Sequence, residues 1–306
     1  MRTGESAAIV ALGPGTPAAE VEIDAEGVRA LLAQYHPDLA DLPIQRADSG
    51  WDNLLWRLGD TLAVRMPRRR AAATLIEHEQ RWLPEIAPRL PLPIPAPLRV
   101  GLPGAGYPWR WSVVPWLRGQ TADIAIPHAD QGSVLAAFLR TLHVPAPAEA
   151  PQNPVRGVPL LQRRAATEER LARVDRLTDC ITPVVRDLWE QALDAPMDVT
   201  PTWLHGDLHS RNVLVEDGAI CAVIDWGDLA QGDCATDLAS IWNLLPDATA
   251  RAAAIQEYGP ASLATWQRAR GWAVLFGVML LDSGLVNDGR LAAAGEATLR
   301  RLTEGP

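Results

Sequence analysis

Short segments rich in apolar residues follow one another through residues 44–66, which predicts strands rather than a helix. Turn-forming residues separate these segments at 48–50 and at 59–60. We therefore expect three antiparallel strands, the first starting at Ile44, the second at Asn53–Leu58 and the third at Thr61–Met66.

A second strand pattern lies late in the chain. The apolar runs Val213–Val215 and Ile220–Ile224 flank the sequence Glu216-Asp217-Gly218, which is typical of a turn. Two short strands joined by such a turn predict a β-hairpin. The hairpin would bring the residues just before its first strand close to those just after its second.

Apolar residues recur every three or four positions through most of the remaining sequence, which predicts helices. Asp24 is suited to cap the first of them, and Pro37 ends it. The most apolar stretch, Gly271–Leu281, is too short to cross a bilayer and is expected to be buried core. The expected helices span residues 25–35, 74–86, 129–142, 161–177, 183–193, 235–245, 248–258, 262–281 and 289–302.

Proline and glycine mark the segments between these elements. Residues 1 to about 20 mix Gly, Pro, Ala and Thr and are expected to form a mobile tail. Residues 91–97 alternate proline with apolar residues and must be extended. Residues 145–159 hold five prolines, and we expect an irregular connector or flap there.

Composition bounds the class of protein. A chain of 306 residues with 48% hydrophobic and 21% charged residues is typical of a soluble globular protein with a large core. The net charge of -9 disfavours nucleic acid and anionic membranes as partners. It suits a cationic small substrate, or it serves solubility alone. Three widely spaced cysteines indicate a reduced cytoplasm rather than a disulfide framework or a zinc site.

Residues 204–226, LHGDLHSRNVLVEDGAICAVIDW, contain the residue types that phosphoryl transfer needs. A carboxylate must orient the attacking hydroxyl and accept its proton, and oxygen ligands must hold magnesium against the phosphates. The predicted hairpin brings Asn212 and Asp225 together, five residues beyond Asp207 and at the end of the second strand. We therefore assign Asp207 as the base, and Asn212 and Asp225 as the metal ligands. A hairpin whose Asp and Asn side chains only cap turns is the alternative.

The same residues match the kinase signature H-R-D-L-x-x-x-N, with Gly206 in place of Arg, and Asp225-Trp226-Gly227 resembles D-F-G. The combination of HGDLHSRN, IDW and GDCATDLA is similar to the aminoglycoside phosphotransferase family, which includes macrolide phosphotransferase-like and choline kinase-like enzymes. The resemblance runs from about Ile44 to the C-terminal helices. It implies an α+β, protein-kinase-like fold with a small β-sheet N-lobe in residues 1–117 and a mainly helical C-lobe in residues 118–306.

The resemblance also implies which residues bind the nucleotide phosphates. Arg65 takes the position of the phosphate-binding Lys on the third strand, and Glu79 takes that of its partner on the next helix. The chain contains no Lys, because all 28 basic residues are Arg. Arg can hold two phosphate oxygens at once. Glu77, two residues from Glu79, would face elsewhere on the helix.

Three further residues are candidates for the nucleotide site. Ser49 and the backbone amides of the first turn would cradle a phosphate, and a plain hairpin turn is the alternative. The hinge between the lobes would offer the N–H of Trp116 or Leu117 to the adenine edge, because Pro115 has none. The resemblance also suggests that Asp237 braces the catalytic loop through its backbone amides.

These assignments predict an enzyme that moves the γ-phosphate of ATP or GTP to a hydroxyl, with magnesium as cofactor. The resemblance implies an antibiotic acceptor, an aminoglycoside or a macrolide, and thus resistance. Asp282 and Asp288, near helix ends, are candidate contacts for a cationic acceptor. A metabolic kinase for choline, homoserine or a sugar is the alternative. A nucleotide-binding pseudokinase is disfavoured because the base and both metal ligands are present together.

Overall fold

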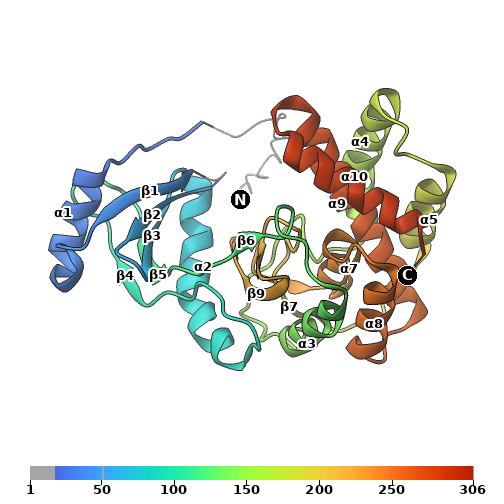
Figure 1. Cartoon of the computed structure of the whole chain (residues 1–306), viewed down its shortest axis with the longest axis horizontal. Coiled ribbons are helices and arrows are strands. Elements are labelled where there is room, and N and C mark those ends of the chain that lie inside the picture. Colours follow the sequence, from blue (N-terminus) through green and yellow to red (C-terminus); the bar gives the residue numbers. More distant parts are fainter. Residues whose placement is uncertain (1–17, 50–51, 306) are drawn as a thin grey trace, which may run out of the picture.

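The structure is a computed structural model that describes residues 18–49 and 52–305. Most of the expected N-terminal tail, residues 1–17, lies outside these described residues. A five-stranded antiparallel sheet with the strand order β1-β2-β3-β5-β4 forms the N-terminal part of the molecule (Figure 1). Its strands are β1 (Ile44–Ser49), β2 (Asn53–Leu58), β3 (Leu62–Pro67), β4 (Arg99–Gly101) and β5 (Trp111–Pro115).

Two helices accompany this sheet, α1 (Ala25–Tyr35) and α2 (Arg70–Ile86). The predicted cap of α1 is confirmed, because Asp24 Oδ1 accepts the N–H of Gly27 at 2.8 Å. The buried residues of α1 pack with the apolar face of the sheet and form the smaller of two hydrophobic clusters. This cluster includes Val28, Leu31, Leu32, Leu54, Val64 and Trp111.

The three predicted strands of residues 44–66 are present, with one difference at the first turn. Asp48 and Ser49 were expected in that turn, but they extend β1 and pair with Leu55 and Leu54. A register shift between Arg46 and Asp48 accommodates the extra residue. Turn propensity at these positions is overridden by strand pairing, and the chain reverses only after residue 49.

The C-terminal part is mainly helical and carries a two-stranded and a three-stranded sheet. Its strands are β6 (Gln120–Thr121), β7 (Thr202–Leu204), β8 (Val213–Glu216), β9 (Ala219–Val223) and β10 (Ala230–Gly232). Its helices are α3 (Gly132–Leu142), α4 (Arg164–Leu177), α5 (Pro183–Asp194), α6 (Ala235–Leu238), α7 (Ser240–Leu244), α8 (Ala248–Tyr258), α9 (Leu263–Asn287) and α10 (Gly289–Thr303). Short 3₁₀ turns lie at Pro37–Leu39, Ala87–Arg89, Ala129–Gln131 and Leu160–Arg163.

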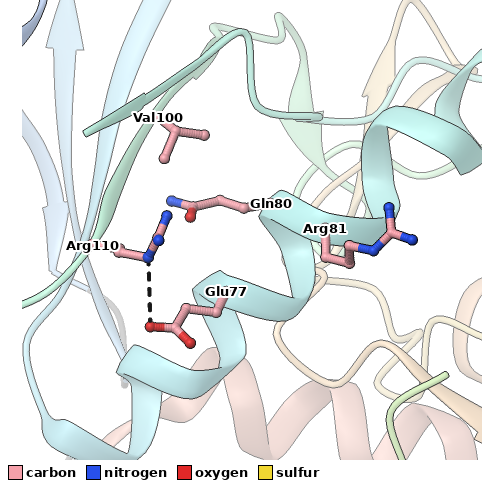
Figure 2. A pocket seen from close by; sticks show the side chains of 5 residues that line it. All are labelled: Glu77, Gln80, Arg81, Val100 and Arg110. Atoms are coloured by element: carbon pink, nitrogen blue, oxygen red, sulfur yellow. Dashed lines mark ion pairs between the residues drawn. The ribbon is translucent and has the colours of Figure 1, made fainter. Parts of the chain in front are cut away.

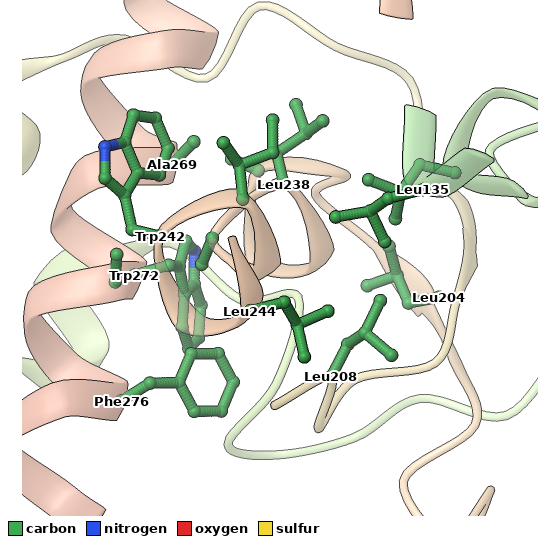
Figure 3. Packing of buried hydrophobic residues seen from close by; sticks show 14 of the residues in the cluster. Leu135, Leu204, Leu208, Leu238, Trp242, Leu244, Ala269, Trp272 and Phe276 are labelled. Carbon is green, nitrogen blue, oxygen red and sulfur yellow. The ribbon is translucent and has the colours of Figure 1, made fainter. Parts of the chain in front are cut away.

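Helix α9 is the centre of the larger hydrophobic core (Figure 3). Trp272 and Phe276 on α9 lie beside Trp242 and Leu244 of α7. The expectation of a buried apolar helix here is confirmed, but its expected length is wrong, because the helix runs for 25 residues. By length and composition α9 could cross a membrane, yet 67% of its most apolar window is buried inside the protein. It is therefore the core helix of this fold.

The larger core also reaches into the N-terminal part. The ring of Trp82 on α2 lies 5.1 Å from that of Trp203 on β7. Leu83, Ile86, Leu92 and Ile94 belong to the same cluster as the C-terminal helices. The C-terminal half of α2 is thus anchored to the helical part, which fixes the position of its other half over the sheet.

Helices α9 and α10 approach each other through glycine. A Cβ atom on Gly295 would lie 2.4 Å from the backbone N of Leu281 and 2.5 Å from the backbone O of Gly277. Backbone atoms inside a helix cannot move aside as a flexible side chain can. The close packing of the two helices therefore requires glycine at position 295.

We expect Gly295→Ala to lower the free energy of unfolding by about 1–3 kcal/mol, the usual cost of overpacking. This loss should appear even though alanine favours helix over glycine by about 1 kcal/mol. Gly289→Ala, at the start of the same helix, is the matched control because, apart from the adjoining backbone, no atom of the described residues lies within 4 Å of its added Cβ. Urea unfolding of both variants measures the difference. Equal stabilities for the two variants would contradict the close approach.

Candidate functional site

The predicted hairpin is confirmed, and it assembles one side of the candidate site. Strands β8 and β9 pair from Val213 with Val223 at the open end. There the N–H of Ile224 donates to the backbone O of Asn212 at 2.9 Å. Asp225 follows directly, so Asn212 and Asp225 lie next to each other, as the sequence predicted. Asp225 has a φ of 59°, a left-handed conformation that Asp tolerates better than most residues.

The loop of residues 205–212, which joins β7 to β8, is held at its start by the carboxylate of Asp237. Asp237 is fully buried and accepts the N–H of His205 at 2.7 Å and that of Gly206 at 2.9 Å. Gly206 has a φ of +86°, and a Cβ atom there would lie 2.6 Å from the backbone O of Asp228. This close approach explains why Gly replaces the Arg of the kinase signature at this position.

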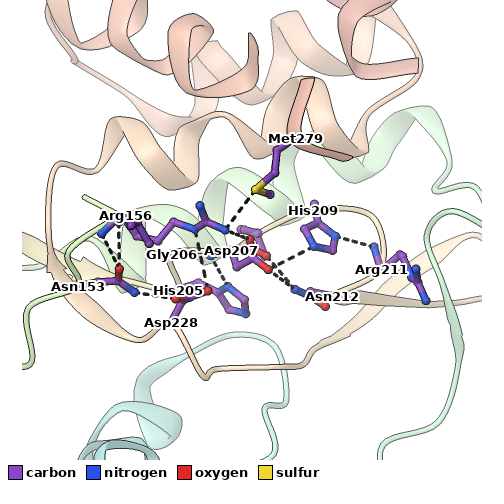
Figure 4. Close-up of polar contacts among 12 residues, drawn as sticks. Asn153, Arg156, His205, Gly206, Asp207, His209, Arg211, Asn212, Asp228 and Met279 are labelled. Atoms are coloured by element: carbon purple, nitrogen blue, oxygen red, sulfur yellow. Dashed lines mark hydrogen bonds and ion pairs between the residues drawn. The ribbon is translucent and has the colours of Figure 1, made fainter. Parts of the chain in front are cut away.

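The carboxylate of Asp207 is contacted on both oxygens (Figure 4). Nη2 of Arg156 donates to its Oδ1 at 2.8 Å. Nε2 of His209 lies 3.3 Å from its Oδ2, on the other side. Nδ2 of Asn212 donates to the backbone O of Asp207 at 2.8 Å and reaches Oδ2 at 3.4 Å.

These contacts keep Asp207 ionised. Burial alone would raise the pKa of Asp207, but His209 and Arg156 outweigh it and hold that pKa well below the ordinary value. The neighbouring carboxyl of Asp228 behaves in the opposite way. Burial raises the pKa of Asp228, and the nearby charge of Asp207 adds to the effect although Arg156 opposes it. One guanidinium is therefore placed beside two carboxyl groups with different proton affinities.

A second cation links the sheet to the hairpin. Nη2 of Arg65 on β3 lies 2.9 Å from Oε1 of Glu79 and 2.9 Å from Oδ1 of Asp225. Burial lowers the pKa of Arg65, but the charges of Glu79 and Asp225 raise it above the ordinary value, so the side chain stays charged. The expected contact between Arg65 and Glu79 is thus present.

Glu77, two residues before Glu79, faces a different region (Figure 2). It lines a hollow between α2 and the edge of the sheet and lies 3.8 Å from Nε of Arg110. The residues that line this hollow do not include any of the loop 205–212. The prediction that Glu77 faces elsewhere on the helix than Glu79 is therefore confirmed.

Asn212 and Asp225 offer suitable oxygens for a hard cation. The Oδ1 of Asn212 and the Oδ2 of Asp225 accept no hydrogen bond from the described residues, and the side chain of Asp225 is 53% exposed. The described residues contain no group of three or more His, Cys, Asp or Glu side chains that could hold a metal ion. Magnesium usually combines one or two protein oxygens with phosphates and water, so the two residues fit this ion.

The remaining nucleotide candidates have different outcomes. The side chain of Ser49 lies outside the described part of the structure. The N–H of Trp116 donates to the backbone O of Thr61 at 2.7 Å, so it is not free for an adenine edge. The N–H of Leu117 donates to no acceptor among the described residues. Of the two hinge donors that the sequence offered, Leu117 is the one that stays a candidate.

Sequence reasoning missed two side chains that contact Asp207. His209 lies within the HGDLHSRN motif, but its side chain was given no role. Arg156 lies in the proline-rich flap, 51 residues before Asp207. The flap is irregular, as expected, and nothing local in its sequence signals a contact with a distant loop.

Comparisons with known proteins bear on the family and the fold of the chain. A family profile described as the phosphotransferase enzyme family matches residues 43–272, about three quarters of the chain. No curated protein sequence matches the chain significantly. The GDP complex of wild-type aminoglycoside 2'-phosphotransferase-IIIa is similar in structure, with a TM-score of 0.63 and 16% sequence identity. That similarity covers 90% of this chain and 98% of the other.

Two further solved structures are similar. Macrolide 2'-phosphotransferase MphH from Brachybacterium faecium has a TM-score of 0.57 at 24% identity, over 90% of this chain and 97% of the other. The streptomycin–ATP–APH(2")-IIa ternary complex has a TM-score of 0.57 at 16% identity, over 85% of this chain and 91% of the other. At these identities the likeness shows the fold, and it confirms the predicted α+β, kinase-like fold class.

The support of the loop by Asp237 generates a test. Asp237→Ala leaves two buried N–H groups without an acceptor, and each costs about 1–3 kcal/mol. Asp247→Ala is the matched control, because Asp247 also accepts two N–H groups but caps α8 where water can replace it. We expect the control to lose only about 1 kcal/mol. Chemical unfolding compares the two, and an Asp237→Ala variant no less stable than the control would contradict the supporting role.

Proposed function

Because the chain belongs to the phosphotransferase enzyme family, we propose that it moves the γ-phosphate of a nucleoside triphosphate to a hydroxyl group of a small molecule. The observation that supports this most is the ionised carboxylate of Asp207 in the same loop as Asn212, with Asp225 beside that loop. Phosphoryl transfer needs one carboxylate for the hydroxyl and oxygen ligands for the phosphates' metal, and the three residues supply this set.

Each residue would have a separate task. Asp207 would orient the acceptor hydroxyl and accept its proton, for which its low pKa keeps it unprotonated at neutral pH. Arg65, oriented by Glu79, would bind phosphate oxygens. Asn212 and Asp225 would hold magnesium, which when bound neutralises part of the phosphate charge. Positioning should contribute most, because the transition state is loose and needs little proton removal.

The nucleotide would bind between an N-lobe in residues 1–117 and a C-lobe in residues 118–306. The N–H of Leu117 would meet the adenine edge, and Ser49 a phosphate. The similar structures include one with GDP and one with ATP, so both ATP and GTP remain candidate co-substrates. The three free cysteines fit a reduced cytoplasm.

For the acceptor we propose an antibiotic, an aminoglycoside or a macrolide, because the similar structures are phosphotransferases named for these two classes. A metabolic kinase for a small alcohol such as choline, homoserine or a sugar is the alternative, with the same residues in the same roles. A pseudokinase would fit Arg65 in place of Lys but not the presence of Asp207, Asn212 and Asp225 together.

Transfer of labelled γ-phosphate from ATP and from GTP tests the function directly. The acceptor panel would hold aminoglycosides, macrolides and small alcohols, with magnesium present. Phosphorylation of any acceptor rejects the pseudokinase. Phosphorylation of small alcohols with none of the antibiotics would favour the metabolic alternative.

Asp207→Asn keeps the size of the side chain and removes its charge and basicity. Transfer to the best acceptor should fall by on the order of 10²–10⁴-fold, the usual range for loss of a general base. Nucleotide affinity, measured by calorimetry, should stay unchanged, because Arg65, Asn212 and Asp225 would still hold the phosphates and metal. Near-normal turnover would show that the base lies elsewhere.

Asp225→Asn should weaken binding of the magnesium nucleotide by at least about 10-fold, since even groups that only support a metal ligand contribute that much. Asn is the suitable replacement because it tolerates the left-handed backbone at this position. Titration without magnesium is the control and should give equal affinities for variant and wild type. A variant that binds the magnesium nucleotide as tightly as wild type would remove Asp225 from the metal site.

A further inference from the structure

We propose that Arg156 is a positioning residue for phosphoryl transfer, which holds the carboxylate of Asp207 in the orientation that receives the acceptor hydroxyl. This inference rests on the proposed function of Asp207 as base. Arg156 lies in the flap of residues 145–159, outside every motif that led to the function. Its side chain nevertheless makes the shortest contact that the Asp207 carboxylate has in the described structure, at 2.8 Å.

The guanidinium of Arg156 is enclosed between carboxylates and helix α9 (Figure 4). Its side chain is only 9% exposed. Nη2 bonds Oδ1 of Asp207, and Nε lies 3.9 Å from Oδ2 of Asp228. On the other face, the guanidinium carbon lies 5.0 Å from the ring of Phe276, and Nη2 lies 3.8 Å from the sulfur of Met279. Such enclosure leaves the side chain little freedom to turn away.

The backbone on the N-terminal side of Arg156 is also fixed. Oδ1 of Asn153 accepts the N–H of Val155 at 2.9 Å and that of Arg156 at 3.1 Å. Nδ2 of the same Asn153 donates to Oδ1 of Asp228 at 2.6 Å. Asp228 thus contacts both Asn153, whose side chain holds the turn, and the guanidinium of Arg156, which follows in the same turn. The local structure of the flap is built around this pair of carboxylates.

On the C-terminal side, Gly157 ties the flap to the support of the loop 205–212. Gly157 has a φ of +67°, and a Cβ atom there would lie 2.6 Å from Cδ1 of Leu204, the residue before that loop. Its N–H donates to Oγ1 of Thr236 at 3.2 Å, and its carbonyl accepts the N–H of Asp233 at 2.9 Å. Thr236 precedes Asp237, so the flap and the loop share one scaffold.

The consequence for Asp207 follows from side-chain geometry. The terminal torsion of an Asp side chain has a broad energy well, so a carboxylate needs partners on its oxygens to keep one orientation. His209 and Asn212 contact Oδ2 at 3.3 Å and 3.4 Å, whereas the charged bond from Arg156 to Oδ1 is much shorter. Without Arg156, the carboxylates of Asp207 and Asp228 would also lose the cation they share, and repulsion would turn Asp207 away.

The test compares Arg156→Ala and Arg156→Lys with wild type. For Arg156→Ala we expect kcat to fall by on the order of 10²-fold, the effect of a misplaced reacting group. KM for the magnesium nucleotide should be unchanged, because among the described residues Arg156 contacts Asp207 but none of the side chains proposed to bind phosphate or metal. Arg156→Lys should recover part of kcat, since Lys supplies the charge without the fork. Arg300→Ala is the control for loss of an arginine, because Arg300 is exposed and its ion pair is with Glu304, the residue that follows α10.

Two further measurements separate positioning from general stabilisation. Added guanidinium ion should restore part of kcat to Arg156→Ala but not to wild type or to Arg300→Ala. In the Asp207→Asn background, Arg156→Ala should cost little more, because residues that act through one another are non-additive. A folded but weakened protein would show neither rescue nor this coupling.

The outcomes are distinct. Lost kcat with unchanged KM, guanidinium rescue and non-additivity with Asp207→Asn support the inference. An active wild type together with an Arg156→Ala variant of normal kcat overturns the inference and leaves the proposed function intact. The same holds if the loss is additive with Asp207→Asn and is not rescued. A wild type that phosphorylates no acceptor overturns the proposed function, and the inference with it.

Discussion

Buried carboxylates need cations or N–H donors as partners, and this constraint governs the structure around the candidate site, because an uncompensated buried charge costs several kcal/mol. Four aspartates from one segment of the chain converge there: Asp207, Asp225, Asp228 and Asp237. Asp237, which is fully buried, accepts hydrogen bonds from two backbone N–H groups. Arg156 lies beside two others, and Arg65 pairs with the fourth, which is half exposed. The four aspartates thus differ in the set of partners that compensates them, which allows different roles for chemically identical groups.

The two cations come from distant parts of the chain, so the site forms only when the whole fold does. Arg65 lies on a strand of the N-terminal sheet, and Arg156 lies in the flap that follows α3. The contact between the rings of Trp82 and Trp203 fixes α2 against the helical part, and α2 in turn carries Glu79 to Arg65. Hydrophobic packing far from the carboxylates therefore sets the distances between charges within the site.

Sequence reasoning succeeded where the determinants are local and failed where they are not. The hairpin that joins Asn212 to Asp225 follows from two apolar runs and one turn, and helical spacing separated Glu79 from Glu77. The N–H of Trp116 was assigned to a ligand, but strand pairing had already given it to Thr61. Arg156 could not be predicted, because its contact depends on how an irregular segment packs against a loop 51 residues away.

Net charge is also a poor guide to the acceptor, because the sequence does not show which acidic side chains pair with arginines from distant segments. Asp282 and Asp288 were candidates to bind a cationic acceptor, and both do contact cations, but these are the protein's own arginines. Arg170 and Arg173 bond Asp282, which is only 12% exposed, and Arg211 lies 2.6 Å from Asp288. Asp288 is engaged further as the cap of α10. A cationic acceptor would have to displace guanidinium groups from these carboxylates, so the net charge of -9 lends no support to a cationic acceptor at these two aspartates.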